Sequence, residues 1–268
     1  MDKLDNVEKT VKKVIERTKM MKNYLIKLFI RIFIFLCFLI CYIWNKQFLV
    51  DFMFQPFFMD FSMMHIAWVI FMVMMLLHLV PVKNRTMAWF KMREEKYDPI
   101  ECSQEELFKF VIDANTKAWR VMIVWLTGNA CVGFLYLFNI IGEAEIMMLT
   151  AFYFLSDYIC ILFYCPFQSH IMGNKCCVNC RIYDWGHFMM FTPMLFIQNF
   201  FCWSLLFTAI IVLIHWEITW NSHPERFYEK SNKTLQCTSC KDKTCQIKRQ
   251  IKKKFMVYRY KREMKKTI

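Results

Sequence analysis

Five long runs of mainly apolar residues, interrupted by charge only at Arg31 and Asp157, are the feature that most constrains the fold of this 268-residue chain. A helix needs about 20 such residues to cross the hydrocarbon core of a bilayer, where only helices and closed barrels satisfy their backbone hydrogen bonds. The runs cover residues 28–44, 61–82, 121–141, 146–167 and 188–216. They predict an all-α, polytopic integral membrane bundle with about five hydrophobic helices.

The amino-acid composition further restricts the class of protein to which the chain can belong. The chain is 57% hydrophobic and 21% charged, which makes it more apolar than an average soluble domain. Its five glycines leave no room for a phosphate-binding P-loop or a dinucleotide fingerprint. The sequence also has no nucleophile elbow and no HExxH motif. We therefore expect a membrane protein without a catalytic site.

The distribution of Lys and Arg predicts the orientation in the membrane. Residues 1–27 carry 8 of them and residues 83–118 carry 7, whereas residues 45–60 carry 1 and residues 142–145 carry none. Cytoplasmic loops of membrane proteins carry the excess of positive charge. We therefore place the N-terminus, the 83–118 loop and the 168–187 loop on the cytoplasmic side of the plasma membrane, with two transmembrane helices in 28–82 and two in 119–167.

The C-terminal tail conflicts with five complete crossings. Residues 217–268 carry 15 Lys and Arg against 5 Asp and Glu, and five crossings would export this basic segment. The fifth segment, residues 188–220, contains Pro193 and the polar pair Gln198–Asn199. It is too short for two full spans but long enough for a re-entrant hairpin buried against protein. We expect this hairpin and a cytoplasmic tail; the alternative is an exported tail.

The segments outside the spans suggest contacts with lipid. Residues 1–27 have helical spacing of apolar residues and predict a basic amphipathic helix on the inner leaflet, or a solvated helix packed on the 83–118 loop. Ser103 and Glu106 form a capping box, so a cytoplasmic helix is expected to run into the third span. The basic, aromatic tail (221–268) predicts attraction to anionic lipid headgroups rather than to nucleic acid.

Cysteine spacing is the most specific signal in the chain. The loop and the tail each hold three of the 13 cysteines: Cys176, Cys177, Cys180, Cys237, Cys240 and Cys245. The pairs Cys177/Cys180 and Cys237/Cys240 have the two-residue spacing that lets one turn offer two thiolates to a metal. They predict a zinc site that joins the loop to the tail, with thiolates favoured by the surrounding lysines. Further ligands available nearby are Cys176, Cys245, His170, His187 and His223.

Three interpretations of these cysteines remain open: structural zinc, disulfides if the tail is exported, and thiol redox or iron–sulfur chemistry. A shared zinc site requires that the apolar segment between Cys180 and Cys237 begins and ends on the same side of the membrane. The sequence disfavours iron–sulfur, and it disfavours haem because His65 and His78 lie about 140° apart around a helix. We interpret both as core histidines that are hydrogen-bonded to their neighbours.

Polar residues also occur inside the fourth span. Tyr153, Asp157, Cys160 and Tyr164 recur at helical spacing and share one face. An ionisable group at bilayer depth usually faces the bundle interior. The face predicts a ligand or proton pocket, or an Asp157 that holds helices together through a partner that the sequence does not identify.

The function that these features favour is a structural, adaptor or regulatory membrane protein with a cysteine-based zinc site that joins the loop and the C-terminal tail. The first alternative is a membrane thiol or metal redox protein that uses the same cysteines. The second is a small transporter or channel that uses the Asp157 face, which the scarcity of glycine disfavours.

Overall fold

The computed structural model describes residues 19–56, 61–80, 87–174 and 176–249. This part of the chain is helical, with an isolated bridge between Pro99 and Asn232, so the predicted all-α class is confirmed. The α-helices are α2 (Lys19–Trp44), α3 (Lys46–Phe54), α4 (Met63–Leu79), α5 (Gln104–Leu137), α6 (Glu143–Leu162), α7 (Gly186–Phe191) and α8 (Phe200–Ser222). The short helical turns are η1 (Met87–Met92), η2 (Glu94–Lys96), η3 (Phe167–Met172), η4 (Tyr183–Trp185), η5 (Thr192–Phe196), η6 (Pro224–Phe227) and η7 (Lys233–Leu235).

Four of the described helices are long and apolar enough to cross a membrane: α2, α5, α6 and α8. Helix α4 is apolar but shorter, with 17 residues. These helices fall within or overlap the five apolar runs of the sequence. The prediction of a membrane-spanning helical protein is therefore confirmed at the level of helix length and composition.

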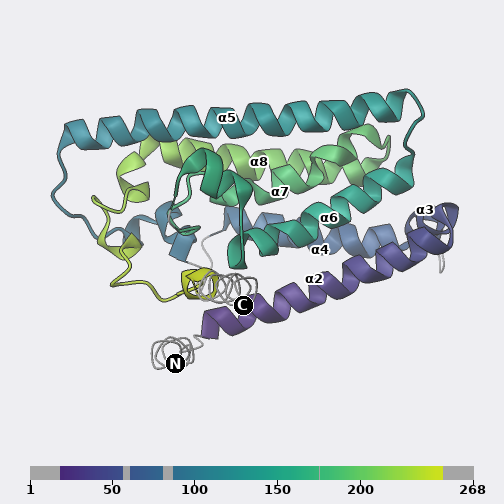
Figure 1. The fold of residues 1–268 in the computed structure, drawn as a ribbon, viewed down its shortest axis with the longest axis horizontal. Helices are drawn as coiled ribbons and strands as arrows, with labels where there is room; N and C mark the ends of the chain where they lie inside the picture. The colour runs from purple at the N-terminus through teal and green to yellow at the C-terminus, as the bar shows by residue number, and fades with distance from the viewer. Residues whose placement is uncertain (1–18, 57–60, 81–86, 175, 250–268) are drawn as a thin grey trace, which may run out of the picture.

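The bundle has two distinct ends (Figure 1). We call the end where α2 and α5 begin and α4 and α8 end the polar end, because the long loops gather there. The opposite end, which we call the turn end, holds α3 and the α5–α6 connection. The starts of α2 and α5, the 163–185 loop and the 223–249 segment all belong to the polar end. The segments assigned to one side from their charge thus share one end of the bundle.

The fifth apolar run is a hairpin and not one helix. Helix α7 and η5 form a first limb (residues 186–196), and α8 returns beside it (Figure 1). Near the turn, Trp203 Nε1 donates to the carbonyl oxygen of Leu195 at 3.1 Å; at the polar end, Trp216 Nε1 donates to that of Arg181 at 2.8 Å. The segment therefore begins and ends at the same end. This agrees with the hairpin expected for this segment: Asn199 ends the first limb and starts a new helix, its side chain accepting from the Phe201 N–H.

Protein encloses the first limb, which packs against α5, α6 and α8. Its buried residues include Phe191, Pro193 and Met194, and Ile197 at the turn is buried as well. Interrupted helix is tolerated at membrane depth only where protein or a water-filled cavity surrounds it. The packing thus explains how a limb too short and too broken to span alone is accommodated.

Helix α5 is a single helix of 34 residues, so the cytoplasmic helix expected after Ser103 does continue into the third span. At 1.5 Å per residue it is about 51 Å long, well beyond the hydrocarbon core of about 30 Å. Its first half carries the exposed ion pairs Glu105–Lys109 and Asp113–Lys117. Ser103 is the N-cap residue, but its side chain makes no capping hydrogen bond, so the predicted capping box is wrong in that respect.

Two further predictions are modified by the structure. Residues 19–27 of the expected leader helix form the start of α2, and residues 45–60, expected to be loop, contain α3. Residues 1–18 and the basic residues 250–268 lie outside the described residues, so the predicted lipid contacts of these segments remain predictions.

Candidate metal centres

A cavity of about 390 Å³ lies at the polar end, between α2, α4, α6 and the start of the hairpin. Its wall includes apolar side chains such as Met74 and Met190. The ionisable and imidazole side chains in the wall are Lys27, Arg31, His78, Asp157, Asp184 and His187. These side chains come from four segments that are distant in sequence, which makes this cavity the principal candidate for a ligand site.

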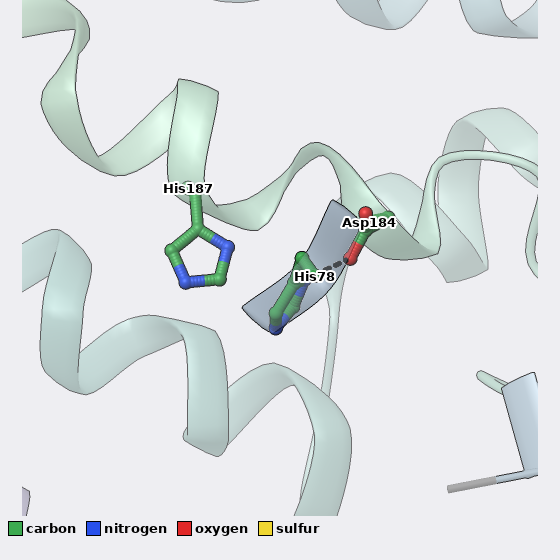
Figure 2. A group of neighbouring side chains, drawn as sticks. All are labelled: His78, Asp184 and His187. Atoms are coloured by element: carbon green, nitrogen blue, oxygen red, sulfur yellow. Dashed lines mark hydrogen bonds and ion pairs between the residues drawn. The ribbon is translucent and has the colours of Figure 1, made fainter. Parts of the chain in front are cut away.

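Three of the lining residues form a close cluster. The possible metal-ligand atoms of His78, Asp184 and His187 all lie within 4.8 Å of one another. Figure 2 shows the three side chains, with His78 Nδ1 hydrogen-bonded to Asp184 Oδ1 at 3.2 Å. The rings of His78 and His187 are edge to face, with centroids 4.7 Å apart. Two imidazoles and one carboxylate are ligands that zinc and other divalent transition metals accept.

Ordered segments hold this cluster. His78 lies in the last turn of α4, while Asp184 and His187 lie in η4 and α7, which follow one another directly. Asp184 is buried, and the ring of Trp89 packs edge to face on that of His78 at 4.5 Å. His65 is partly buried and makes the expected hydrogen bond to a neighbour, its Nδ1 accepting from the Ser62 N–H at 3.1 Å.

A buried ion pair forms another part of the cavity wall. Arg31 Nη1 lies 2.8 Å from Asp157 Oδ2 and also donates to the carbonyl oxygen of Phe154. The guanidinium stacks over the rings of Phe154 and Tyr158, at 4.1 and 3.9 Å from their centroids. Asp157 therefore has a partner on α2, which the sequence did not identify. The pair favours the interpretation in which Asp157 holds helices together.

The predicted polar face of the fourth span does not converge on the cavity. Asp157 lines it, but Tyr153 packs on Trp125 with ring centroids 4.6 Å apart. The backbone carbonyl of Cys160 accepts a weak hydrogen bond from Cys177 Sγ at 3.7 Å, and Tyr164 is exposed. The tyrosines that do line the cavity are Tyr24, Tyr158 and Tyr183.

The loop and tail cysteines lie at the same polar end. Cys176 and Cys240 pack together on the buried residues Ala88, Val178 and Leu235. Each predicted pair forms a turn: the Cys180 N–H donates to the carbonyl oxygen of Cys177 at 3.0 Å, and the Cys240 N–H to that of Cys237 at 3.4 Å. The loop and the tail thus share one end of the bundle, as a shared site requires.

Not all of the predicted metal ligands are together. Cys177 Sγ donates to Gln168 Oε1 at 3.0 Å and accepts from Lys248 Nζ at 3.0 Å, while Cys180 is buried among core residues. Of the predicted additional ligands, His170 bonds to Tyr164, His223 pairs with Glu225, and His187 lies in the cavity. Within the described ranges, His78, Asp184 and His187 are the group of three whose ligand atoms lie within 4.8 Å.

The pKa values of the loop thiols differ from those expected from the nearby positive charges. Burial raises the pKa of Cys176 and of Cys180 to about 11, and it also raises that of Cys177. The prediction that nearby lysines favour thiolates is therefore wrong for the metal-free loop. Desolvation outweighs the attraction of the neighbouring cations, so thiolate formation there requires a metal ion to displace the protons.

Sequence reasoning did not identify the cluster of His78, Asp184 and His187. His78 was interpreted as a lone core histidine, and His187 as a further ligand for the cysteine site. The available signal was topological, because the alternation of spans places the end of the second run and the 168–187 loop at the same end of the bundle.

Comparison with protein-family models, with curated proteins and with solved structures gives no match for this chain. The geometry of its own residues is therefore the basis for assigning a function.

Proposed function

We propose that this chain is a structural or adaptor protein of the membrane, without catalysis, in which a zinc-bound cysteine centre joins the 168–187 loop to the C-terminal tail. The polar end would face the cytoplasm of the plasma membrane, where the basic tail meets anionic lipid headgroups. In a reducing compartment, paired cysteines at this spacing are typical of structural zinc.

One observation carries the proposal: the hairpin of residues 186–222 returns the chain to the end from which it started. Arg181 forms a bidentate ion pair with Glu217, which also accepts from Trp185 Nε1 at 2.8 Å. These bonds join the start of the hairpin to the end of α8. The loop that precedes the hairpin and the tail that follows it are thereby held beside each other.

The contacts favour a particular ligand set. Cys176 and Cys240 both pack against the cluster of Ala88, Val178 and Leu235, and Cys237 shares a turn with Cys240. Burial, together with the nearby thiols of Cys240 and Cys237, raises the pKa of Cys245. The Lys243 N–H donates to Cys240 Sγ at 3.4 Å, and backbone N–H bonds of this kind orient and stabilise a thiolate. We therefore assign the zinc to Cys176, Cys237, Cys240 and Cys245. The ion supplies the free energy that draws the four sulfur atoms to bonding distance.

The zinc content of the purified full-length chain tests this assignment. We expect the zinc content per chain to fall by about one ion in Cys176→Ser and in Cys240→Ser and to be unchanged in Cys177→Ser. Cys102→Ser, at a loop thiol outside the centre, is the matched control. Equal zinc content in Cys240→Ser and wild-type chain, with both folded, would refute the proposal.

A second candidate, thiol redox chemistry, is favoured by a different observation. A hydrogen bond from the Cys160 thiol lowers the pKa of Cys165, which lies just beyond the end of α6. A thiol with a low pKa is the more reactive toward oxidants and alkylating agents. Under this function, Cys165 is alkylated faster than Cys176 at pH 7, as mass spectrometry of the modified peptides would show. Equal rates would exclude it.

A further inference from the structure

We infer that His78, Asp184 and His187 form a second metal centre, separate from the cysteines, that binds a divalent transition-metal ion and leaves coordination positions open to the cavity for an anionic oxygen ligand. The inference does not depend on the cysteine zinc site. Its ligands lie on α4, η4 and α7, and none of them belongs to the tail.

The separation of the ligand atoms suits metal binding. Two ligand atoms that each lie about 2.1 Å from one metal ion are about 3.0 Å apart in octahedral and about 3.4 Å apart in tetrahedral geometry. His78 Nδ1 and Asp184 Oδ1 are 3.2 Å apart, between these two values. His187 approaches from α7, and Figure 2 shows it beside His78, so small side-chain rotations bring the third ligand to the same ion.

The environment keeps the ligands in place. The side chain of Asp184 is 4% exposed and that of His78 is 17% exposed. The Trp89 ring supports His78, and the backbone of Asp184 and His187 is fixed by the same hairpin start that Arg181 joins to α8. A ligand set held by packed elements loses little conformational entropy when the metal binds.

The centre is open rather than closed. Structural zinc sites are filled by four protein ligands, whereas three protein ligands leave a position for a water molecule or substrate. All three residues line the cavity of about 390 Å³, so that position faces a space large enough for a small molecule. This distinguishes the histidine centre from the cysteine centre.

Charge indicates the class of ligand that completes the centre. Among the described residues, the cavity wall carries two cationic side chains, Lys27 and Arg31, and two carboxylates, Asp157 and Asp184. These charges balance, so a bound divalent ion leaves the cavity positive. A phosphate or carboxylate group is therefore favoured at the open position, from a free anion or from a lipid headgroup.

Cobalt(II) titration of the full-length chain in detergent micelles tests the centre. Nitrogen and oxygen ligands give weak visible ligand-field bands, whereas thiolates add intense near-ultraviolet charge transfer, so the two centres are distinguishable in one sample. We expect ligand-field bands without sulfur charge transfer for one equivalent of cobalt. We expect the affinity for that equivalent to fall at least about 100-fold in His187→Ala and in Asp184→Asn.

Asp184→Asn is the decisive variant because asparagine keeps an acceptor for the hydrogen bond to His78 and loses the charge. His215→Ala, at a partly buried histidine of α8 outside the cavity wall, is the matched control and should bind like the wild type. Wild-type affinity in a folded Asp184→Asn chain, or cobalt with sulfur charge transfer only, overturns the centre. If the variants do not fold, protection of His187 from diethyl pyrocarbonate by cobalt in the wild-type chain decides, with His215 as the internal reference.

The anionic ligand has its own test on the cobalt-loaded chain. A change in the ligand-field bands on addition of inorganic phosphate identifies a site for a free anion. A change with phosphatidic acid and none with phosphate identifies a lipid headgroup. If neither changes the spectrum, the open position does not exist and that part of the inference is wrong.

Discussion

The polar end of this bundle buries charged side chains, whereas the turn end carries an exposed ion pair. The described residues include six buried charged side chains, and all of them lie at the polar end: Arg31, Lys91, Arg181, Asp184, Arg226 and Asp242. At the turn end the ion pair Lys46–Glu145 leaves the lysine side chain 61% exposed. Burial of charge is costly unless partners or ligands compensate it. The contrast indicates that the polar end is built for binding and the turn end for closure of the helices.

The largest effect is expected from breaking the buried pair of the cavity. In Arg31→Met, Asp157 loses its cation and two helices lose their polar contact. We expect a loss of about 3 kcal/mol in the free energy of unfolding, at the lower limit for buried pairs because Asp157 is a third exposed. Unfolding by denaturant in mixed micelles, followed by tryptophan fluorescence, measures it. The double variant Arg31→Met/Asp157→Asn should recover most of the loss.

The matched change at the turn end is Lys46→Met, which removes the cation that pairs with Glu145. An exposed pair of this kind contributes little to stability, so we expect a much smaller loss than in Arg31→Met. Equal losses in Arg31→Met and Lys46→Met would show that the two ends do not differ in the way described above.

Lys91, at the polar end, makes the stability of the fold depend on pH and so tests the comparison between the two ends. Its side chain is fully buried, its Nζ donates to the Cys180 carbonyl oxygen at 3.2 Å, and burial lowers its pKa to about 8. Between pH 8 and 10.5 the unfolded chain keeps a proton that the folded chain has lost, so the cost of burying this charge is relieved as the pH rises. We expect the stability of wild type relative to Lys91→Met to rise by up to about 1.4 kcal/mol per pH unit in that window. Parallel pH profiles for the two chains would contradict the assignment.

A smaller effect is expected from close packing between α5 and the hairpin. A Cβ atom on Gly133 would overlap with Phe196 Cζ, so Gly133→Ala forces the phenyl ring to move. We expect a loss of about 1–2 kcal/mol. Gly128 lies on the same helix with no atom within 4 Å of such a Cβ, and Gly128→Ala should stabilise the chain by about 0.5–1 kcal/mol. The same sign of change in both variants would exclude packing as the cause.

The sequence predicted the elements whose signal is local. Apolar length marked the spans, and the residues after Ser103 predicted the long helix α5. Pro193, Gln198 and Asn199 correctly marked the hairpin, because each weakens a continuous helix and Asn199 caps the next one. Helix α3 was missed because nine residues between two spans give too short a pattern to be distinguished from loop.

The candidate sites were harder to predict from the sequence because they depend on contacts between distant segments. Two-residue spacing identifies Cys237 and Cys240 as a pair within one turn, but no local rule joins His78 to His187 or Arg31 to Asp157. The prediction that nearby lysines favour thiolates also failed, since the desolvation of Cys176 depends on what covers it in the fold. Residues that act together across the bundle are recognised only once the register of the helices is known.

The broken limb of the hairpin has a consequence for biogenesis. Its interrupted backbone between Gly186 and Ile197 cannot lie alone among lipid chains, because the groups freed at each break need protein partners. Helices α5 and α6 provide that surface, and both precede the limb in the chain. We therefore expect the limb and α8 to insert together and after α5 and α6, so that the freed backbone groups meet their protein partners.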